Sequence, residues 1–263
     1  GAHRRADRVI GNPPAPTARL WEFWIMRALD RYQDLIVQYS MEFTEIIHSG
    51  DIAAAVPSCP GWSMTDLALH LSGTQRWSTQ IVLSGVRGEH PVGPADRDGL
   101  ERWFVEGAEQ LVLALRESDP DAPTWTFGPQ PRLISFWSRR MAHEVAVHLW
   151  DAKASQGLAF DIDAELAADG IDEVCTVFLP MRLKQGAIPQ LEQSLLLEPT
   201  DSPGASFLLT ARQPDAQPGP QVTLRGPAGD LLLALWGRIA IDGLEIEGDE
   251  ALAREFLLAG ATA

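Results

Sequence analysis

Cysteine is scarce in this chain of 263 residues, which contains only Cys59 and Cys175. Two cysteines exclude a disulfide-based scaffold and a cysteine-rich zinc module, and they favour a reducing compartment. Long hydrophobic runs are also missing, because no apolar stretch approaches the ~20 residues that a membrane-spanning helix needs. The first residues lack the charged-then-apolar order of a secretory signal peptide. We therefore expect a cytoplasmic protein that does not enter membranes.

Positive charge is the second scarce feature. Lys and Arg number 21 against 36 Asp and Glu, which gives a formal net charge of −15. Nucleic-acid phosphates and anionic membrane surfaces repel a chain of this charge, so neither is an expected partner. A small-molecule substrate remains the expected partner. Most of the excess of acidic over basic residues falls after residue 160, where there are 17 acidic and 6 basic residues. This asymmetry is a first indication of two units.

The N-terminal part of the sequence predicts a bundle of antiparallel helices. Residues 1–17 contain three prolines and are expected to be a flexible lead-in. Apolar residues then recur at three- and four-residue steps, as on one face of a long helix. A capping box at residues 63–66 marks the start of a second helix. The expected helices cover residues 18–49, 64–83, 98–117 and 132–156, and they form a unit that spans residues 18–158.

The pattern changes after Gly157, where helical stretches alternate with short apolar runs bounded by Pro, Gly and Asp. The expected strands cover residues 193–199, 205–212, 221–224 and 244–247, and the expected helices cover residues 163–183, 230–238 and 249–258. Residues 159–263 therefore predict a compact α+β unit that follows the bundle. The chain as a whole is assigned to the α+β class.

Side chains that commonly bind metals occur on helix faces expected to point into the bundle. Glu144 and His148 are four residues apart and continue the apolar stripe of Trp137 and Met141. The same spacing on the second helix places His70 on an inward face. Burial of an unpaired carboxylate costs much free energy of folding. Two imidazoles and a carboxylate at inward positions are therefore expected to interact with a common partner or with one another.

These three side chains predict a site for a divalent metal ion. Three protein ligands leave a fourth position open for water or substrate, which is typical of catalytic zinc sites. Zn²⁺ suits nitrogen and carboxylate ligands best, and Ni²⁺, Fe²⁺ and Co²⁺ are alternatives. Asp151 is placed to orient an imidazole, whereas His143 lies one residue off the stripe and is the weaker candidate. The other interpretation is a hydrogen-bonded polar network without metal, and the two-histidine zinc-protease motif is absent.

Three stretches resemble the mycothiol-dependent maleylpyruvate isomerase family. Two of them, VPSCPGWSMTDLALH at residues 56–70 and RMAHEVAVHLWD at residues 140–151, resemble signature sequences of that family's N-terminal domain. The third, RGPAGDLLLALWGR at residues 225–238, is similar to the family's second domain, which resembles sterol carrier proteins. The likeness covers nearly everything after residue 18 and implies a DinB-like four-helix metal-binding domain followed by a sterol-carrier-like domain.

The resemblance also implies a site and a reaction. It implies that His70, Glu144 and His148 hold a divalent metal, usually zinc, and that Arg238 faces the interdomain cleft as a catalytic residue. Mycothiol or a similar small thiol would be the cosubstrate, deprotonated at the metal site. Its thiolate would add to an electrophilic carbon, transiently in an isomerase and permanently in an S-transferase. Neither cysteine of the chain is then needed as the nucleophile.

Two other functions are compatible with the same sequence. The first is a thiol-independent biosynthetic enzyme that uses the metal as a Lewis acid. The second is a non-catalytic regulatory protein that binds a metal or a ligand on the same scaffold. Arg238 also has a plainer interpretation, as a surface residue whose charge suits the end of a helix. We expect the nine tryptophans, Trp77 and Trp137 among them, to belong mainly to the core, with a pocket wall as the alternative.

Overall fold

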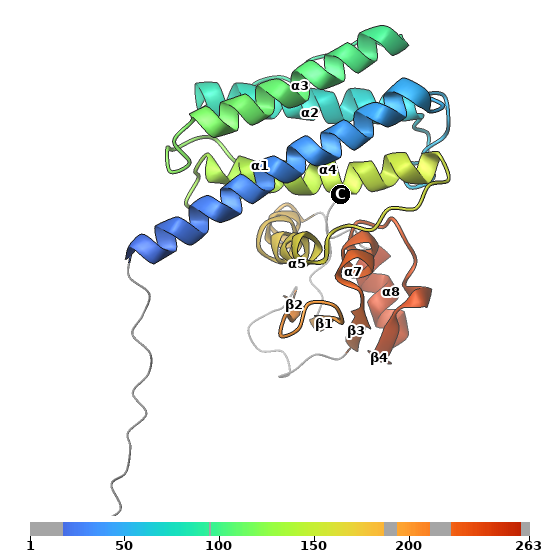
Figure 1. Cartoon of the computed structure of the whole chain (residues 1–263). Coiled ribbons are helices and arrows are strands. Elements are labelled where there is room, and N and C mark those ends of the chain that lie inside the picture. The colour runs from blue at the N-terminus through green and yellow to red at the C-terminus, as the bar shows by residue number, and fades with distance from the viewer. Residues whose placement is uncertain (1–17, 95, 187–193, 211–221, 259–263) are drawn as a thin grey trace, which may run out of the picture.

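A computed structural model describes residues 18–94, 96–186, 194–210 and 222–258 (Figure 1). The predicted lead-in, residues 1–17, lies outside these ranges, as do residues 193, 211–212 and 221 of the predicted strands. Long helices form an N-terminal bundle, and a smaller C-terminal unit of short helices and strands lies against it. This arrangement confirms the α+β class. Within the described residues, no helix has both the length and the apolar character needed to cross a membrane.

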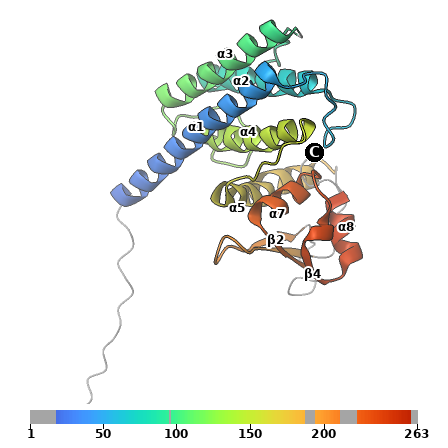
Figure 2. The same ribbon diagram turned by 45° about the vertical axis from the view of Figure 1, so that its right-hand side comes forward.

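The bundle is formed by α1 (Ala18–Ser49), α2 (Met64–Ser84), α3 (Arg97–Glu117) and α4 (Ser135–Ser155). Each of α1 and α2 packs against both α3 and α4, and Figure 2 shows the bundle from a second side. The predicted capping box is present at the start of α2, where the Ser63 side chain accepts from the backbone N–H of Asp66. α4 begins three residues later than predicted, because Leu133 forms an isolated antiparallel bridge with Pro123, and the backbones of Arg132 and Ile134 on either side hydrogen-bond to Thr124 and Ala122.

The C-terminal unit starts with a helix that the sequence predicts as one piece over residues 163–183. This prediction is wrong in detail, since α5 (Ala164–Glu173) is followed by a π-helical turn, η1 (Val174–Phe178), and then by α6 (Leu179–Lys184). Pro180 at the start of α6 has no backbone N–H to donate, so the regular hydrogen-bond ladder cannot continue through it. The backbone accommodates this in the preceding turn, where Leu179 donates to Val174 five residues back.

A four-stranded sheet completes the unit, in the order β2-β1-β3-β4. Its strands are β1 (Ser194–Pro199), β2 (Phe207–Thr210), β3 (Val222–Gly226) and β4 (Glu245–Gly248), with β1 and β3 parallel and the outer pairs antiparallel. The remaining elements are α7 (Ala228–Leu235), η2 (Ile241–Gly243) and α8 (Glu250–Leu258). α5 and α7 pack together and lie between the sheet and α4 (Figure 1).

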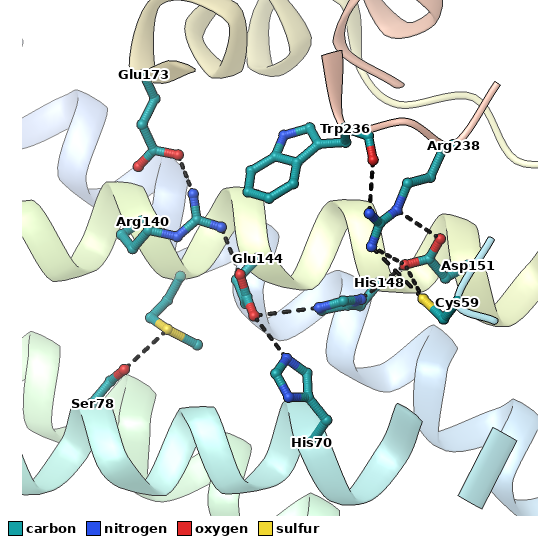
Figure 3. A network of polar contacts seen from close by, with 11 residues as sticks. Cys59, His70, Ser78, Arg140, Glu144, His148, Asp151, Glu173, Trp236 and Arg238 are labelled. Carbon is teal, nitrogen blue, oxygen red and sulfur yellow. Dashed lines mark hydrogen bonds and ion pairs between the residues drawn. The ribbon is translucent and has the colours of Figure 1, made fainter. Parts of the chain in front are cut away.

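α7 ends before the predicted boundary at residue 238. Gly237 has a φ of 67°, a left-handed conformation that terminates helices and that favours glycine. Arg238 therefore lies beyond the helix, and its backbone N–H donates to Leu233 at 2.8 Å. Its side chain points toward the bundle and contacts Asp151 on α4, so Arg238 is not a surface charge at the end of the helix (Figure 3).

A network of polar side chains attaches α5 to the bundle through Asp169. Its carboxylate accepts from the Tyr32 hydroxyl at 2.8 Å and from Arg139 Nε at 3.0 Å, and it lies 2.8 Å from His143 Nε2. Burial alone would raise the pKa of Asp169, but the contacts of His143 and Arg139 outweigh it and hold that pKa below its ordinary value. The ionised carboxylate therefore stabilises the fold.

We expect Asp169→Asn to lower the free energy of unfolding by about 2 kcal/mol at pH 7, because three buried or half-buried donors lose their charged partner. A depressed folded-state pKa gives stability that is complete above the unfolded-state pKa and is lost as the pH falls through the folded-state pKa. The difference between the wild type and the variant should therefore shrink as the pH is lowered from 5 to 3. Urea unfolding at several pH values measures it, with Asp34→Asn on the exposed Arg116 pair as control. An equal difference at pH 7 and pH 3 would contradict the assignment.

Candidate functional site

Three predicted ligand residues meet between α2 and α4 (Figure 3). Glu144 Oε1 lies 3.4 Å from His70 Nε2 and 3.3 Å from His148 Nε2. One donor atom from each residue lies within 4.8 Å of the other two. The two imidazole rings are 5.1 Å apart at their centroids and nearly perpendicular. The spacing of these residues along their helices and the packing of α2 against α4 thus bring the three side chains together.

The surroundings of the three residues follow from their helices. Glu144 and His148 project from one face of α4, where the adjoining Trp137 and Met141 are buried in the core. His70 comes from α2 and is the most accessible of the three, with 39% of its side chain exposed against 9% for His148. The group therefore has a rigid, buried side on α4 and a solvent-accessible side toward α2.

The charges at this point favour an ionised carboxylate. Burial would raise the pKa of Glu144, but hydrogen bonds from His148 and His70 and the charge of Arg140 hold it well below its ordinary value. Burial would lower the pKa of His148, but its contacts with Asp151 and Glu144 raise that pKa to about 9. Two imidazole nitrogens facing one carboxylate oxygen form a donor set that fits a divalent ion of the zinc type.

Asp151, the residue predicted to orient an imidazole, contacts His148 directly. Its Oδ2 lies 2.9 Å from His148 Nδ1, the ring nitrogen that points away from Glu144. The fully buried Asp151 also accepts from Ser58 Oγ at 2.5 Å. With Nδ1 facing this carboxylate, His148 presents Nε2 toward Glu144.

Arg238 lies against the same carboxylate. Its Nε and Nη2 donate to the two oxygens of Asp151 at 3.2 and 3.1 Å, and its Nη1 donates to the Trp236 carbonyl at 2.8 Å. The side chain is 13% exposed. The structure thus brings Arg238 to the edge of the site as the ion-pair partner of Asp151, and most of its N–H groups are already engaged.

Arg140 and Glu173 adjoin the site and are not among the residues predicted from the sequence. Arg140 Nη2 donates to Glu144 Oε2 at 2.6 Å, and Arg140 Nη1 donates to Glu173 on α5. The spacing of four residues between Arg140 and Glu144 on one helix is a signal that the sequence does contain. The position of Glu173 depends on how α5 packs on α4, so no local spacing indicates it.

Other side chains considered from the sequence are not among the three converging residues, although Cys59 Sγ lies 3.8 Å from both Asp151 Oδ2 and Arg238 Nη2 at the edge of the site. His143 is buried on another face of α4 and pairs with Asp169. Burial and the charge of Asp151 raise the pKa of Cys59, and burial raises the pKa of Cys175 to about 12, so neither thiol is ionised at neutral pH. Trp77 and Trp137 are buried, which confirms the core interpretation for these two.

Two family models match the chain in succession. The Mycothiol maleylpyruvate isomerase N-terminal domain matches residues 35–153, which include all three converging side chains. The MDMPI C-terminal domain matches residues 165–255. The chain belongs to the mycothiol-dependent maleylpyruvate isomerase family. Membership in this family confirms the resemblance that the three sequence stretches indicated.

Solved structures share the fold of this family member. They are mycothiol-dependent maleylpyruvate isomerase, 16% identical with a TM-score of 0.61, and a point mutant of that enzyme, 15% identical with a TM-score of 0.62. Each match covers 83% of this chain and 92% of the other. At this level of identity the likeness establishes the architecture alone. No curated protein sequence matches the chain.

Proposed function

We propose that this family member is an enzyme that depends on a divalent metal and on a small thiol, mycothiol or a close analogue. Its reaction is the isomerisation of a small electrophilic substrate or the transfer of the thiol to it. The observation that carries the proposal is the convergence of His70, Glu144 and His148 in a chain of this family. We further propose a cytoplasmic location and a boundary between the two units at residues 158–159.

The three side chains would hold the ion, and Zn²⁺ suits their donor set best. A bound divalent ion would supply Lewis acidity toward a carbonyl oxygen and would keep a coordinated thiol deprotonated. Asp151 keeps the His148 ring oriented, and Arg140 holds one oxygen of Glu144. Arg238 supplies positive charge beside the site, and the Nη1 N–H that is not engaged by the Trp236 carbonyl can meet a substrate carboxylate.

The thiolate of the cosubstrate is the nucleophile in this proposal. It adds to one carbon of a conjugated double bond, and the displaced electron pair moves onto the adjoining carbonyl oxygen. Rotation about the resulting single bond and return of the electron pair then expel the thiolate and leave the isomer. In a transferase the enolate instead takes up a proton from water at the carbon next to the carbonyl, and the carbon–sulfur bond remains. The raised pKa values of Cys59 and Cys175 fit this use of an external thiol.

A thiol-independent Lewis-acid enzyme is the second candidate. The observation that favours it is that contacts with Asp151, Trp236 and Cys59 engage most of the N–H donors of Arg238 that a thiolate or an anionic substrate would need. The two functions differ in whether the metal-loaded protein binds the thiol. A non-catalytic protein is distinguished from both by its lack of turnover.

Metal analysis followed by a thermal-shift titration with mycothiol tests the proposal. We expect one divalent ion per chain and an increase of several degrees in the melting temperature at saturating mycothiol, since binding to the folded state alone stabilises it. The S-methyl derivative of mycothiol is the matched control, and it should have no effect. Chelation of the metal should abolish the shift.

Each other outcome selects a different function. A metal-loaded protein whose melting temperature does not respond to mycothiol would overturn thiol dependence and favour the Lewis-acid enzyme. A protein without stoichiometric metal, unchanged by chelator, would overturn both enzymatic functions. Metal and thiol binding without conversion of conjugated cis-alkene acids or of thiol-reactive electrophiles would favour a binding protein.

A further inference from the structure

The carboxylate of Glu144 has a different partner for each oxygen. Oε1 faces the imidazoles of His70 and His148, whereas Oε2 accepts from Arg140 Nη2 at 2.6 Å (Figure 3). A carboxylate that is free to rotate would exchange its two oxygens and lose orientation. Arg140 thus fixes which oxygen Glu144 presents to the imidazoles.

Arg140 is itself held in an almost completely buried position. Its side chain is 4% exposed, and the rings of Phe178 and Trp236 lie 5.1 and 5.6 Å from its guanidinium carbon. The flat guanidinium carries two separate nitrogens for its two carboxylate partners, so it bridges Glu144 and Glu173. Figure 3 shows this bridge between α5 and α4, and the contact of Glu144 with His70 that continues it to α2.

Glu173 supplies a negative charge that offsets the free-energy cost of burying the Arg140 guanidinium. Its side chain is 2% exposed, and it pairs with Arg140 Nη1. A lone buried cation next to a divalent-ion site would repel the ion and would carry a large desolvation cost. Glu173 offsets both effects. It is the last residue of α5, directly before the π-helical turn, and therefore belongs to the C-terminal unit.

We infer that Arg140 and Glu173 are positioning residues for the metal ligand Glu144, so that the C-terminal unit helps to set the metal affinity of the bundle. This inference rests on the metal site of the proposed function. Glu173 acts through Arg140, and neither residue contacts the ion. Packing of α5 onto α4 and metal binding are then coupled, each favouring the other.

Two variants of the full-length chain test the inference, and the neighbouring Asp172 provides a matched control. Glu173→Gln removes one charge and leaves Arg140 to share its charge with Glu144 alone of the two carboxylates that it bridges. The double variant Arg140→Met, Glu173→Met replaces the buried pair with apolar side chains, which proteins commonly tolerate, and keeps the net charge unchanged. Asp172→Asn removes a charge of the same sign one residue away, and its α4 contact with Arg139 does not extend to Glu144.

Competition with a chromophoric chelator measures the Zn²⁺ affinity, and the visible spectrum of the Co²⁺-loaded protein reports the ligand geometry. We expect both variants to bind Zn²⁺ roughly 10–100-fold more weakly than the wild type, the usual effect of losing an outer partner of a metal ligand. Their Co²⁺ spectra should shift. Asp172→Asn should match the wild type in both measurements.

The outcomes separate this inference from the proposed function. Wild-type affinity and an unchanged Co²⁺ spectrum in the double variant would overturn the positioning role and leave the metal site intact. Weakening in Glu173→Gln but not in the charge-neutral double variant would also overturn positioning, since charge alone would explain it. A wild-type protein that binds no Zn²⁺ would overturn the proposed function, and this inference with it.

Discussion

Replacing His148 with alanine is expected to abolish stoichiometric metal binding while the bundle stays folded. The imidazole supplies one of three donors, and its Nε2 lies 3.3 Å from Glu144 Oε1. Two remaining donors, one of them on the accessible His70, leave a site with poor affinity. The loss should exceed the roughly 10–100-fold that outer partners cost. Metal content after gel filtration and the far-ultraviolet circular dichroism spectrum measure the two parts of this expectation.

A second buried histidine on the same helix supplies the control. His143 lies five residues earlier, contacts Asp169 rather than Glu144, and is almost fully buried. His143→Gln keeps a hydrogen-bonding group there and should retain its metal while losing some stability. If the His148 variant keeps the wild-type metal content, the ligand set is wrong. If both variants lose metal equally, general destabilisation of α4 explains the loss, and His148 has no special role.

The helical repeat explains why the core of the site could be predicted. A period of 3.6 residues fixes which side chains share a face whatever the helix packs against, so Glu144 and His148 could be placed together from spacing alone. His70 followed from the same rule applied to α2. The bounds of α1, residues 18–49, were likewise predictable from its apolar stripe.

Contacts between distant segments could not be predicted in this way. Arg238 is 87 residues from Asp151 in sequence, and Glu173 is 33 residues from Arg140. These pairs form because α5 and α7 pack on the bundle, and packing of that kind has no repeat in the sequence. Two of the differences from the predicted helices do have local signals in the sequence. Pro180 inside an apolar stretch indicates a break in the helix, and Gly237 indicates its end.

Asp151 is expected to give the second large effect, because it supports both the imidazole of His148 and the guanidinium of Arg238. Asp151→Ala should weaken Zn²⁺ binding roughly 10–100-fold, since His148 loses the acceptor that orients it. The same change leaves Arg238 buried without its carboxylate. The free energy of unfolding should therefore fall by about 3–5 kcal/mol. Chelator competition and urea unfolding of the full chain measure the two effects.

Asp151→Asn separates the two roles of this carboxylate. Its amide oxygen can still accept from His148 Nδ1, so the Zn²⁺ affinity should stay within a few-fold of the wild type. The amide carries no charge, so the ion pair with Arg238 is lost and stability should still fall. Asp242→Asn, which removes an exposed pair with Arg254 in the C-terminal unit, should change neither quantity. Equal loss of Zn²⁺ affinity in the alanine and asparagine variants would show that the charge of Asp151, rather than its orientation of His148, supports the site. Unchanged stability in both variants would show that Arg238 does not depend on Asp151 to hold the two units together.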